Sequence, residues 1–114
     1  MKLPIVLIGP MGVGKTTIGK KLAKTLELPF IDTDALITSS FGSPSEIFET
    51  QGEKAFRAIE EKVVADAIAA DSVIATGGGA VLSGSTQRKL KECTVVYLST
   101  DGKRIKSRLK GGSR

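Results

Sequence analysis

GPMGVGKTT, at residues 9–17, is the most informative part of this sequence of 114 residues. Gly9 is followed by four residues and then by Gly14-Lys15-Thr16, which completes the P-loop pattern. The apolar run at 3–8 predicts a buried strand before this pattern, and apolar residues at helical spacing predict a helix over 16–28 after it. The pattern therefore lies between a strand and a helix, as a phosphate-binding loop requires.

The residue types of this loop suit a nucleoside triphosphate. Glycines let successive backbone N–H groups turn inward around a phosphate, and the start of the helix adds the positive end of its dipole. We expect Lys15 to reach the β- and γ-phosphates and the Thr16 hydroxyl to coordinate Mg²⁺. The alternative, a glycine-rich turn with an exposed lysine, is disfavoured by the spacing and the flanking elements. The predicted nucleotide-binding residues in the loop are Gly12, Val13, Gly14, Lys15, Thr16 and Thr17.

Apolar runs alternate with helical patterns along the rest of the chain. Strands are predicted at 29–31, 72–76 and 94–98. Helices are predicted at 35–41, from Glu46 to about residue 70 with an interruption near Gly52, and at 87–91. Strands that alternate with helices imply crossover connections and a parallel sheet. The predicted fold class is therefore α/β, with a central parallel sheet flanked by helices in one domain over residues 1–114.

Composition narrows the choice of partner and compartment. Lys and Arg number 17 against 12 for Asp and Glu, which predicts an anionic partner. With no Trp, one Tyr and four Phe, the chain has few rings for stacking bases, so we expect small phosphates rather than nucleic acid. One Cys and no His argue against a zinc cluster and an internal disulfide, and no apolar run approaches membrane-spanning length. We predict a soluble cytoplasmic protein.

Asp32 and Asp34 follow the strand predicted at 29–31. If the chain stays extended through Thr33, both side chains point to the same side, at the carboxyl edge of the sheet where such folds bind ligands. One aspartate could hold Mg²⁺ through water while the other accepts a hydrogen bond or a proton from an attacking hydroxyl. The alternative, that Asp34 only caps a helix starting at Ala35, is equally compatible with the spacing.

Arg57 and the glycine triplet 77–79 each allow a structural and a functional interpretation. Arg57 has glutamates at i−4, i+3 and i+4, a pattern typical of a helix-surface ion pair; the functional interpretation is a bidentate fork for a carboxylate substrate. The triplet follows a predicted buried strand, where three glycines are costly unless a backbone or ligand approaches closely. A tight turn is the alternative there.

Taken together, the motifs resemble those of the shikimate kinase family. The resemblance rests on five stretches in the family's order and at its intervals: GPMGVGKTT, FIDTDALI, IFETQGEKAFRAIE, VIATGGGAVL and VVYL. It implies a three-layer P-loop kinase fold and ATP-dependent phosphorylation of the 3-hydroxyl of shikimate, on the route to chorismate and the aromatic amino acids. A switch GTPase is not indicated, because the motifs Asp-x-x-Gly and Asn-Lys-x-Asp do not occur.

The resemblance also implies roles for individual residues. Asp34 is expected to bind the acceptor hydroxyls and, as a candidate base, to be catalytic together with Lys15. Arg57 is expected to bind the shikimate carboxylate, and Asp32 to serve Mg²⁺ with Thr16, while ATP is the co-substrate. The functional interpretations of Asp34 and Arg57 are thereby favoured. The implied substrate-binding set is Asp34, Arg57, Gly77, Gly78 and Gly79.

The last residues, 108–114, resemble the start of the family's lid, and the family's C-terminal part is missing from the sequence. Arg114 would lie about where a lid arginine contacts ATP phosphates, although a terminal residue would be loosely held. Either the sequence belongs to a longer protein, which we favour, or it is a short chain that binds nucleotide and catalyses poorly.

Two other functions stay open at this stage. One is a related P-loop kinase for another small hydroxy acid such as gluconate, and the other is a nucleotide-binding module without catalysis. In the favoured interpretation the partners are ATP and shikimate, without nucleic acid or membrane, and the protein is a monomer.

Overall fold

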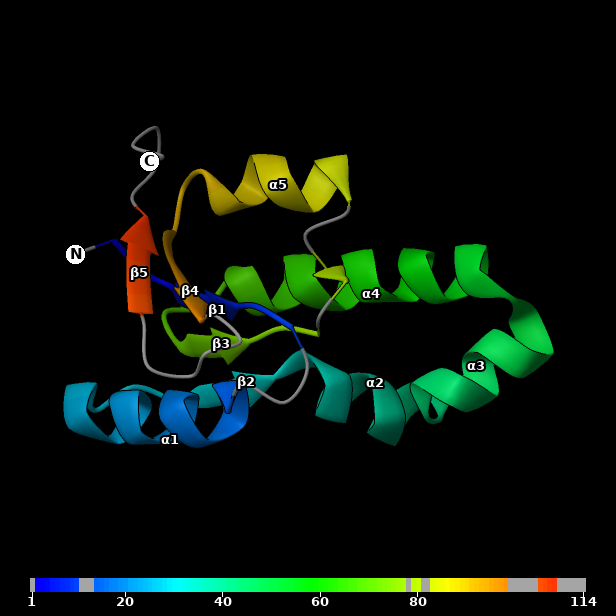
Figure 1. The fold of residues 1–114 in the computed structure, drawn as a ribbon, viewed down its shortest axis with the longest axis horizontal. Coiled ribbons are helices and arrows are strands. Elements are labelled where there is room, and N and C mark those ends of the chain that lie inside the picture. Colours follow the sequence, from blue (N-terminus) through cyan, green and yellow to red (C-terminus); the bar gives the residue numbers. More distant parts are fainter. Residues whose placement is uncertain (1, 11–13, 78, 81–82, 99–104, 109–114) are drawn as a thin grey trace.

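A computed structural model describes residues 2–10, 14–77, 79–80, 83–98 and 105–108. Figure 1 shows a central sheet with helices on both sides of it. Among the residues that the structure describes, no helix is both long enough and apolar enough to cross a membrane. Four of the predicted site residues lie outside the described ranges: Gly12, Val13, Gly78 and Arg114.

The five strands that the structure describes form one sheet in the order β2-β3-β1-β4-β5. They are β1 (Ile5–Ile8), β2 (Phe30–Asp32), β3 (Val73–Ala75), β4 (Thr94–Leu98) and β5 (Ile105–Arg108). The first four strands are parallel, which confirms the predicted parallel sheet, whereas β5 is antiparallel to β4. The prediction missed β5 because its sequence, Ile-Lys-Ser-Arg, has one apolar residue and no strand pattern.

The described helices are α1 (Lys15–Leu26), α2 (Thr33–Phe41), α3 (Pro44–Gln51), α4 (Glu53–Ile68) and α5 (Gly84–Leu90). The predicted interruption near Gly52 is confirmed, since this residue separates α3 from α4 with a φ of 93°. The predicted start of α5 at Gln87 was wrong, because the Ser83 side chain caps the helix by accepting a hydrogen bond from the Thr86 N–H.

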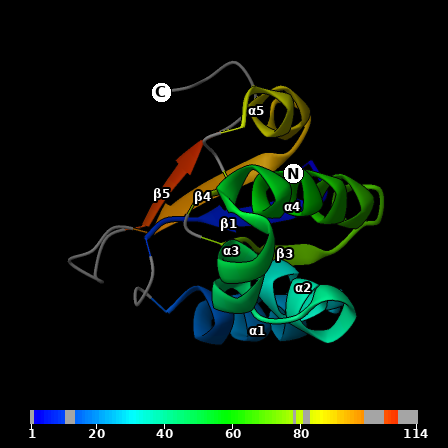
Figure 2. The same cartoon turned by 90° about the vertical axis from the view of Figure 1, so that its right-hand side faces the viewer.

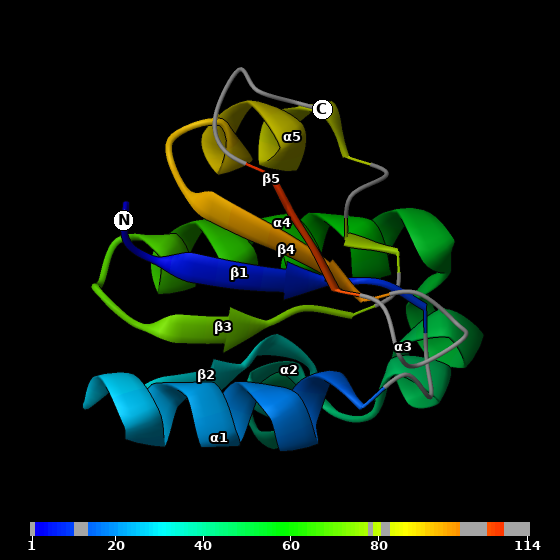
Figure 3. The same cartoon turned by 60° about the vertical axis from the view of Figure 1, so that its left-hand side comes forward.

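The alternation of side chains along β1 explains the three layers. Ile5 and Leu7 pack against Ala23 of α1 on one face of the sheet. Val6, one residue out of phase, packs against Ala67 of α4 and Leu90 of α5 on the other face. Figure 3 shows the resulting order, with α1 on one side of the strands and α4 and α5 on the opposite side. A three-layer α/β fold is thus confirmed.

A third apolar cluster lies away from the sheet and consists of Ile37, Ile47 and Phe56. These residues come from α2, α3 and α4, which Figure 2 shows grouped around α3 at the end of the molecule that faces the viewer. A capping box starts α3, with reciprocal hydrogen bonds between Ser43 and Glu46. This group of helices carries Asp34 and Arg57, so it forms one wall of the candidate site.

Candidate active site

The register of the sheet brings three functional segments to one edge. Asp32 pairs with Ala75, and Ala75 pairs with Leu7, so β2, β3 and β1 end side by side. Beyond these residues the chain continues into α2, into the glycine triplet and into the P-loop respectively. Figure 3 shows the arrowheads of β1 and β3 pointing the same way, toward α3. The strand ends therefore form the carboxyl edge that was predicted to bind ligands.

The N-terminus of α1 is arranged for an anion. Gly14 precedes it with a φ of 89°, and no side chain of the described residues forms a cap hydrogen bond there. The Lys15 ammonium donates hydrogen bonds to the carbonyls of Gly9 and Pro10, the second at 3.2 Å. Burial lowers the pKa of Lys15, while the charges of Asp34 and Asp32 act in the opposite direction. The lysine and both aspartates thus lie within electrostatic reach of one another.

Thr16 and Asp32 place two oxygen ligands together. The Thr16 hydroxyl donates to Asp32 Oδ2 at 3.0 Å, while Asp32 Oδ1 accepts from the Ala35 N–H at 3.1 Å. Hydroxyl and carboxylate oxygens are the ligands that Mg²⁺ prefers, and this ion usually takes one or two protein ligands besides water and phosphate oxygens. The donor set therefore fits the predicted ion. No cluster of three or more His, Cys, Asp or Glu suited to a metal occurs in the described ranges.

The structural expectations for Asp34 were both wrong. The chain does not stay extended through Thr33, because α2 already begins at this residue. The helix cap is Asp32 rather than Asp34, which lies in the first turn of α2. Burial raises the pKa of Asp34, the nearby charge of Asp32 raises it further, and Lys15 opposes the shift. A half-buried carboxylate that lies near a lysine and has a raised pKa is better suited to accept a proton than to cap a helix.

The glycine triplet contacts the two predicted acceptor-binding side chains. An ideal Cβ built on Gly77 would lie 2.6 Å from Asp34 Oδ1. One built on Gly79 would lie 2.5 Å from an Arg57 terminal nitrogen and 2.9 Å from its Cζ. The expected close approach at the triplet is therefore confirmed at both described glycines, and the atoms that approach belong to Asp34 and Arg57.

Arg57 is held from several sides. Its terminal nitrogen is 2.8 Å from Glu60 Oε1, and its Nε is 3.7 Å from Glu53 Oε2. Its guanidinium also lies over the rings of Phe56 and Phe48, with 5.3 Å and 6.0 Å from Cζ to the ring centroids. The expected ion pairs exist, but the pair with Glu60 is not an ordinary surface pair, because the Glu60 side chain is only 5% exposed. Because the Glu60 carboxylate is buried, its ion pair with Arg57 restricts where the guanidinium can lie.

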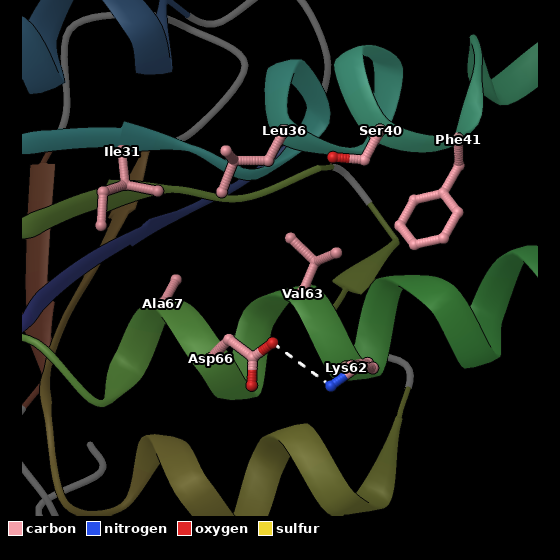
Figure 4. Close-up of a pocket in the computed structure, with 8 residues that line it drawn as sticks. All are labelled: Ile31, Leu36, Ser40, Phe41, Lys62, Val63, Asp66 and Ala67. Carbon is pink, nitrogen blue, oxygen red and sulfur yellow. Dashed lines mark hydrogen bonds and ion pairs between the residues drawn. The ribbon is translucent and has the colours of Figure 1, made fainter.

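Two hollows adjoin the helices near β2. One, of about 640 Å³, is lined by Thr16 and Asp32 together with parts of α1 and α2, and so opens beside the candidate metal site. The other, of about 430 Å³, lies between α2 and α4. Figure 4 shows Leu36 and Phe41 of α2 facing Val63 of α4 across it. Of the predicted site residues that the structure describes, none lines this second hollow.

Sequence reasoning missed three buried polar residues at the site. The charge pattern around Arg57 predicts Glu60 at the surface, although its place one turn after Phe56 on the apolar stripe of α4 indicates burial. No motif in the sequence marks Thr33 or Thr76 as a site residue. Both are almost fully buried, and each hydroxyl donates to a carbonyl of the neighbouring strand.

Comparisons with known proteins indicate one family. The family model described as shikimate kinase matches residues 11–114. A shikimate kinase from Rhodococcus erythropolis is 52% identical over 100 residues, which cover 86% of this chain and 59% of the relative. One from Mycobacterium avium is 51% identical over 104 residues, covering 87% of this chain and 59% of the relative. The chain thus spans somewhat more than half the length of the curated relatives that it matches.

Solved structures give the same result. A shikimate kinase from Acinetobacter baumannii, solved in complex with shikimate, superposes with a TM-score of 0.80 at 42% identity and covers 84% of this chain and 55% of that one. A shikimate kinase from Bacteroides thetaiotaomicron gives a TM-score of 0.81 at 36% identity, covering 86% and 57%. A gluconokinase from Sinorhizobium meliloti, at 23% identity and a TM-score of 0.55 over 82% and 55% of the two chains, shares the fold alone. The motifs, the geometry of the carboxyl edge and the family match together establish that this chain belongs to the shikimate kinase family.

Proposed function

We propose that the protein containing this chain transfers the γ-phosphoryl group of ATP to the 3-hydroxyl of shikimate. The observation that carries this proposal is the meeting at one sheet edge of Lys15 and Asp34 with the glycine triplet that contacts Arg57. A phosphate-binding group, a proton acceptor and a cation for a carboxylate are the three elements that this reaction needs. The relative from Acinetobacter baumannii, solved with shikimate, supports the choice of acceptor.

The donor side consists of the N-terminus of α1 and Lys15. The uncapped N–H groups at the start of α1 and the Lys15 ammonium bind the phosphates of ATP and offset the negative charge that spreads over the transferred group. Residues 12–17 are proposed to surround these phosphates. Arg114 is proposed to contact them from the lid.

Mg²⁺ is proposed to act at Thr16 and Asp32, whose oxygens fit it. When bound, the ion would supply positive charge that offsets the negative charge of the phosphates. Asp32 has a second task in the protein itself, because its other oxygen caps α2 and so fixes the orientation of the carboxylate.

The acceptor side consists of Asp34, Arg57 and residues 77–79. Asp34 accepts a hydrogen bond from the attacking hydroxyl and takes its proton, and its raised pKa brings it closer to the range useful for a base at neutral pH. Arg57 binds the shikimate carboxylate as a fork, while Glu60 holds the guanidinium from the buried side. The backbone at Gly78 contacts the ring. These contacts hold the hydroxyl in line with the phosphate, which provides most of the catalysis in such transfers.

We further propose that the protein works as a monomer in the cytoplasm, without nucleic acid or membrane as a partner. The single cysteine supports a reducing compartment, since within these 114 residues it has no partner for a disulfide.

The test is a turnover assay on the full-length protein with ATP and Mg²⁺, in which ADP release is followed with shikimate or gluconate as acceptor. We expect turnover with shikimate and little with gluconate. Arg57→Ala should raise the KM for shikimate by at least tenfold, because a charge-assisted fork contributes about 1.5–3 kcal/mol. The matched control is Arg88→Ala on the exposed face of α5, which should leave both KM values unchanged. ADP release that does not depend on shikimate would refute the proposal.

A further inference from the structure

Two buried threonines cross-link the strand ends that carry the site. Thr33 is 0% exposed and Thr76 is 3% exposed. The Thr33 hydroxyl donates to the Ala75 carbonyl at 3.4 Å, and the Thr76 hydroxyl donates to the Leu7 carbonyl at 3.0 Å. Since β2, β3 and β1 are neighbours in that order, the two hydrogen bonds form a continuous link across three strands.

Thr76 occupies the middle of this link. Its backbone N–H also donates to the Leu7 carbonyl, at 3.2 Å, so backbone and side chain bind the same oxygen. The next residue along its own chain is Gly77, which contacts Asp34. Leu7 lies two residues before Gly9, whose carbonyl accepts from Lys15. The hydroxyl of Thr76 thus joins the segment that contacts the acceptor base to the segment that holds the phosphate-binding lysine.

Thr33 extends the link to the other side of Asp34. It lies between Asp32 and Asp34 in sequence and is the first residue of α2. Its hydrogen bond to Ala75 fixes the start of this helix against β3. Asp34 is therefore positioned from two directions, by its own helix start and by the glycine that packs against it.

Alignment of donor and acceptor is the main contribution that a protein makes to phosphoryl transfer, and a misplacement of about 1 Å can lower the rate about a hundredfold. We propose, on the basis of the function proposed above, that Thr76 is a positioning residue which sets the distance between the P-loop and the acceptor side. The backbone bond to Leu7 persists without the hydroxyl, so the fold does not depend on it. The position of the P-loop relative to the acceptor side does depend on this hydroxyl.

Three variants of the full-length protein test this. Thr76→Val removes the hydroxyl at nearly constant volume, and Thr76→Ser retains it. Thr94→Val is the matched control, because Thr94 is also buried, at 4% exposed, and its hydroxyl donates to the Lys2 carbonyl at 2.7 Å at the opposite end of the same sheet. We expect Thr76→Val to lower kcat about tenfold while both KM values change by less than about threefold. The KM values change little because the P-loop and the acceptor side each keep their own contacts with substrate.

The controls separate positioning from stability. Thr76→Ser should restore kcat to within about twofold of the wild type, and Thr94→Val should leave kcat unchanged even if it lowers the melting temperature equally. A merely structural role would give both valine variants the same fall in kcat. That result, or an unchanged kcat in Thr76→Val, would overturn the proposal.

Amide hydrogen exchange without substrates provides a readout that does not depend on the acceptor. In Thr76→Val, peptides covering 5–10 and 73–77 should exchange about tenfold faster than in the wild type, whereas Thr94→Val should accelerate exchange only at the other end of β1 and β4. If the wild type fails to phosphorylate shikimate, the proposed function is wrong while the exchange rates still decide on the link. Unchanged exchange at 73–77 in Thr76→Val would refute the link itself.

Discussion

Adding one methyl group at Gly79 should weaken shikimate binding without harming the fold. Gly79 is not among the glycines with positive φ, so alanine can adopt its backbone conformation. A compatible Gly→Ala change stabilises a protein by about 0.4–1 kcal/mol through the unfolded chain. The new Cβ, however, would lie 2.5 Å and 2.8 Å from the terminal nitrogens of Arg57. The steric cost therefore acts on the guanidinium.

The size of the expected rise in the KM for shikimate depends on how tightly Arg57 is held in place. Ordinary contact begins at 3.4 Å, so the guanidinium has to retreat by about 0.9 Å. It cannot do so freely, because Glu60 holds it at 2.8 Å and Phe56 lies beneath it. Losing a charge-assisted interaction with the substrate carboxylate costs about 1.5–3 kcal/mol. The KM for shikimate should then rise about 10- to 100-fold, while the KM for ATP stays within about twofold.

Steady-state kinetics with each substrate varied in turn provide the measurement. The control is Gly84→Ala on α5, where a Cβ would meet its nearest neighbour at an unstrained 3.7 Å. This control should leave both KM values unchanged. The reasoning is refuted if Gly79→Ala binds shikimate as the wild type does, or if the two KM values rise together.

Three further predictions concern single sites. Gly77→Ala should lower kcat about 10- to 100-fold with a smaller change in the KM for shikimate, because its Cβ would displace the Asp34 carboxylate rather than Arg57; equal effects in the two glycine variants would contradict this. Burial raises the pKa of Asp34, so its contribution favours the folded state while the group is protonated and is lost as the pH rises through the folded pKa. Asp34→Asn should therefore abolish turnover yet raise the melting temperature at pH 7, and this gain should vanish below about pH 4; a lower melting temperature at pH 7 would be inconsistent. Ser43→Ala should lower the free energy of unfolding by about 1 kcal/mol through loss of the capping box, as measured by urea unfolding, and an unchanged midpoint would argue against the cap.

The sequence predicted the layers of this fold well because its strands and helices have clear hydrophobic patterns. The run before Gly9 and the stripe on α4 each gave the correct element, and the P-loop pattern located the start of α1 to within one residue. Element ends were less predictable. The start of α2 depends on which aspartate caps it, and the sequence offers both Asp32 and Asp34 at suitable positions.

The sequence indicated candidate residues for the site but not the contacts between them. The P-loop spacing indicated Lys15, and the family resemblance favoured Asp34 and Arg57, yet neither could indicate that Gly77 packs against Asp34 and Gly79 against Arg57. Such pairings are set by the order of strands, which joins residues far apart in sequence. For Glu60 two signals conflicted: its position one turn after Phe56 indicates burial, but a glutamate near an arginine on a helix is usually a surface residue.

The central place of β1 in the sheet has a consequence for how this protein is made. Ile5 is synthesised many residues before its pairing partners, Val73 and Thr94. The apolar strand β1, which leads into the P-loop, therefore stays unpaired until β3 and β4 have been synthesised. Formation of the parallel sheet is correspondingly non-local and slow. A nascent chain paused before residue 94 should be a client of chaperones that bind short aliphatic segments.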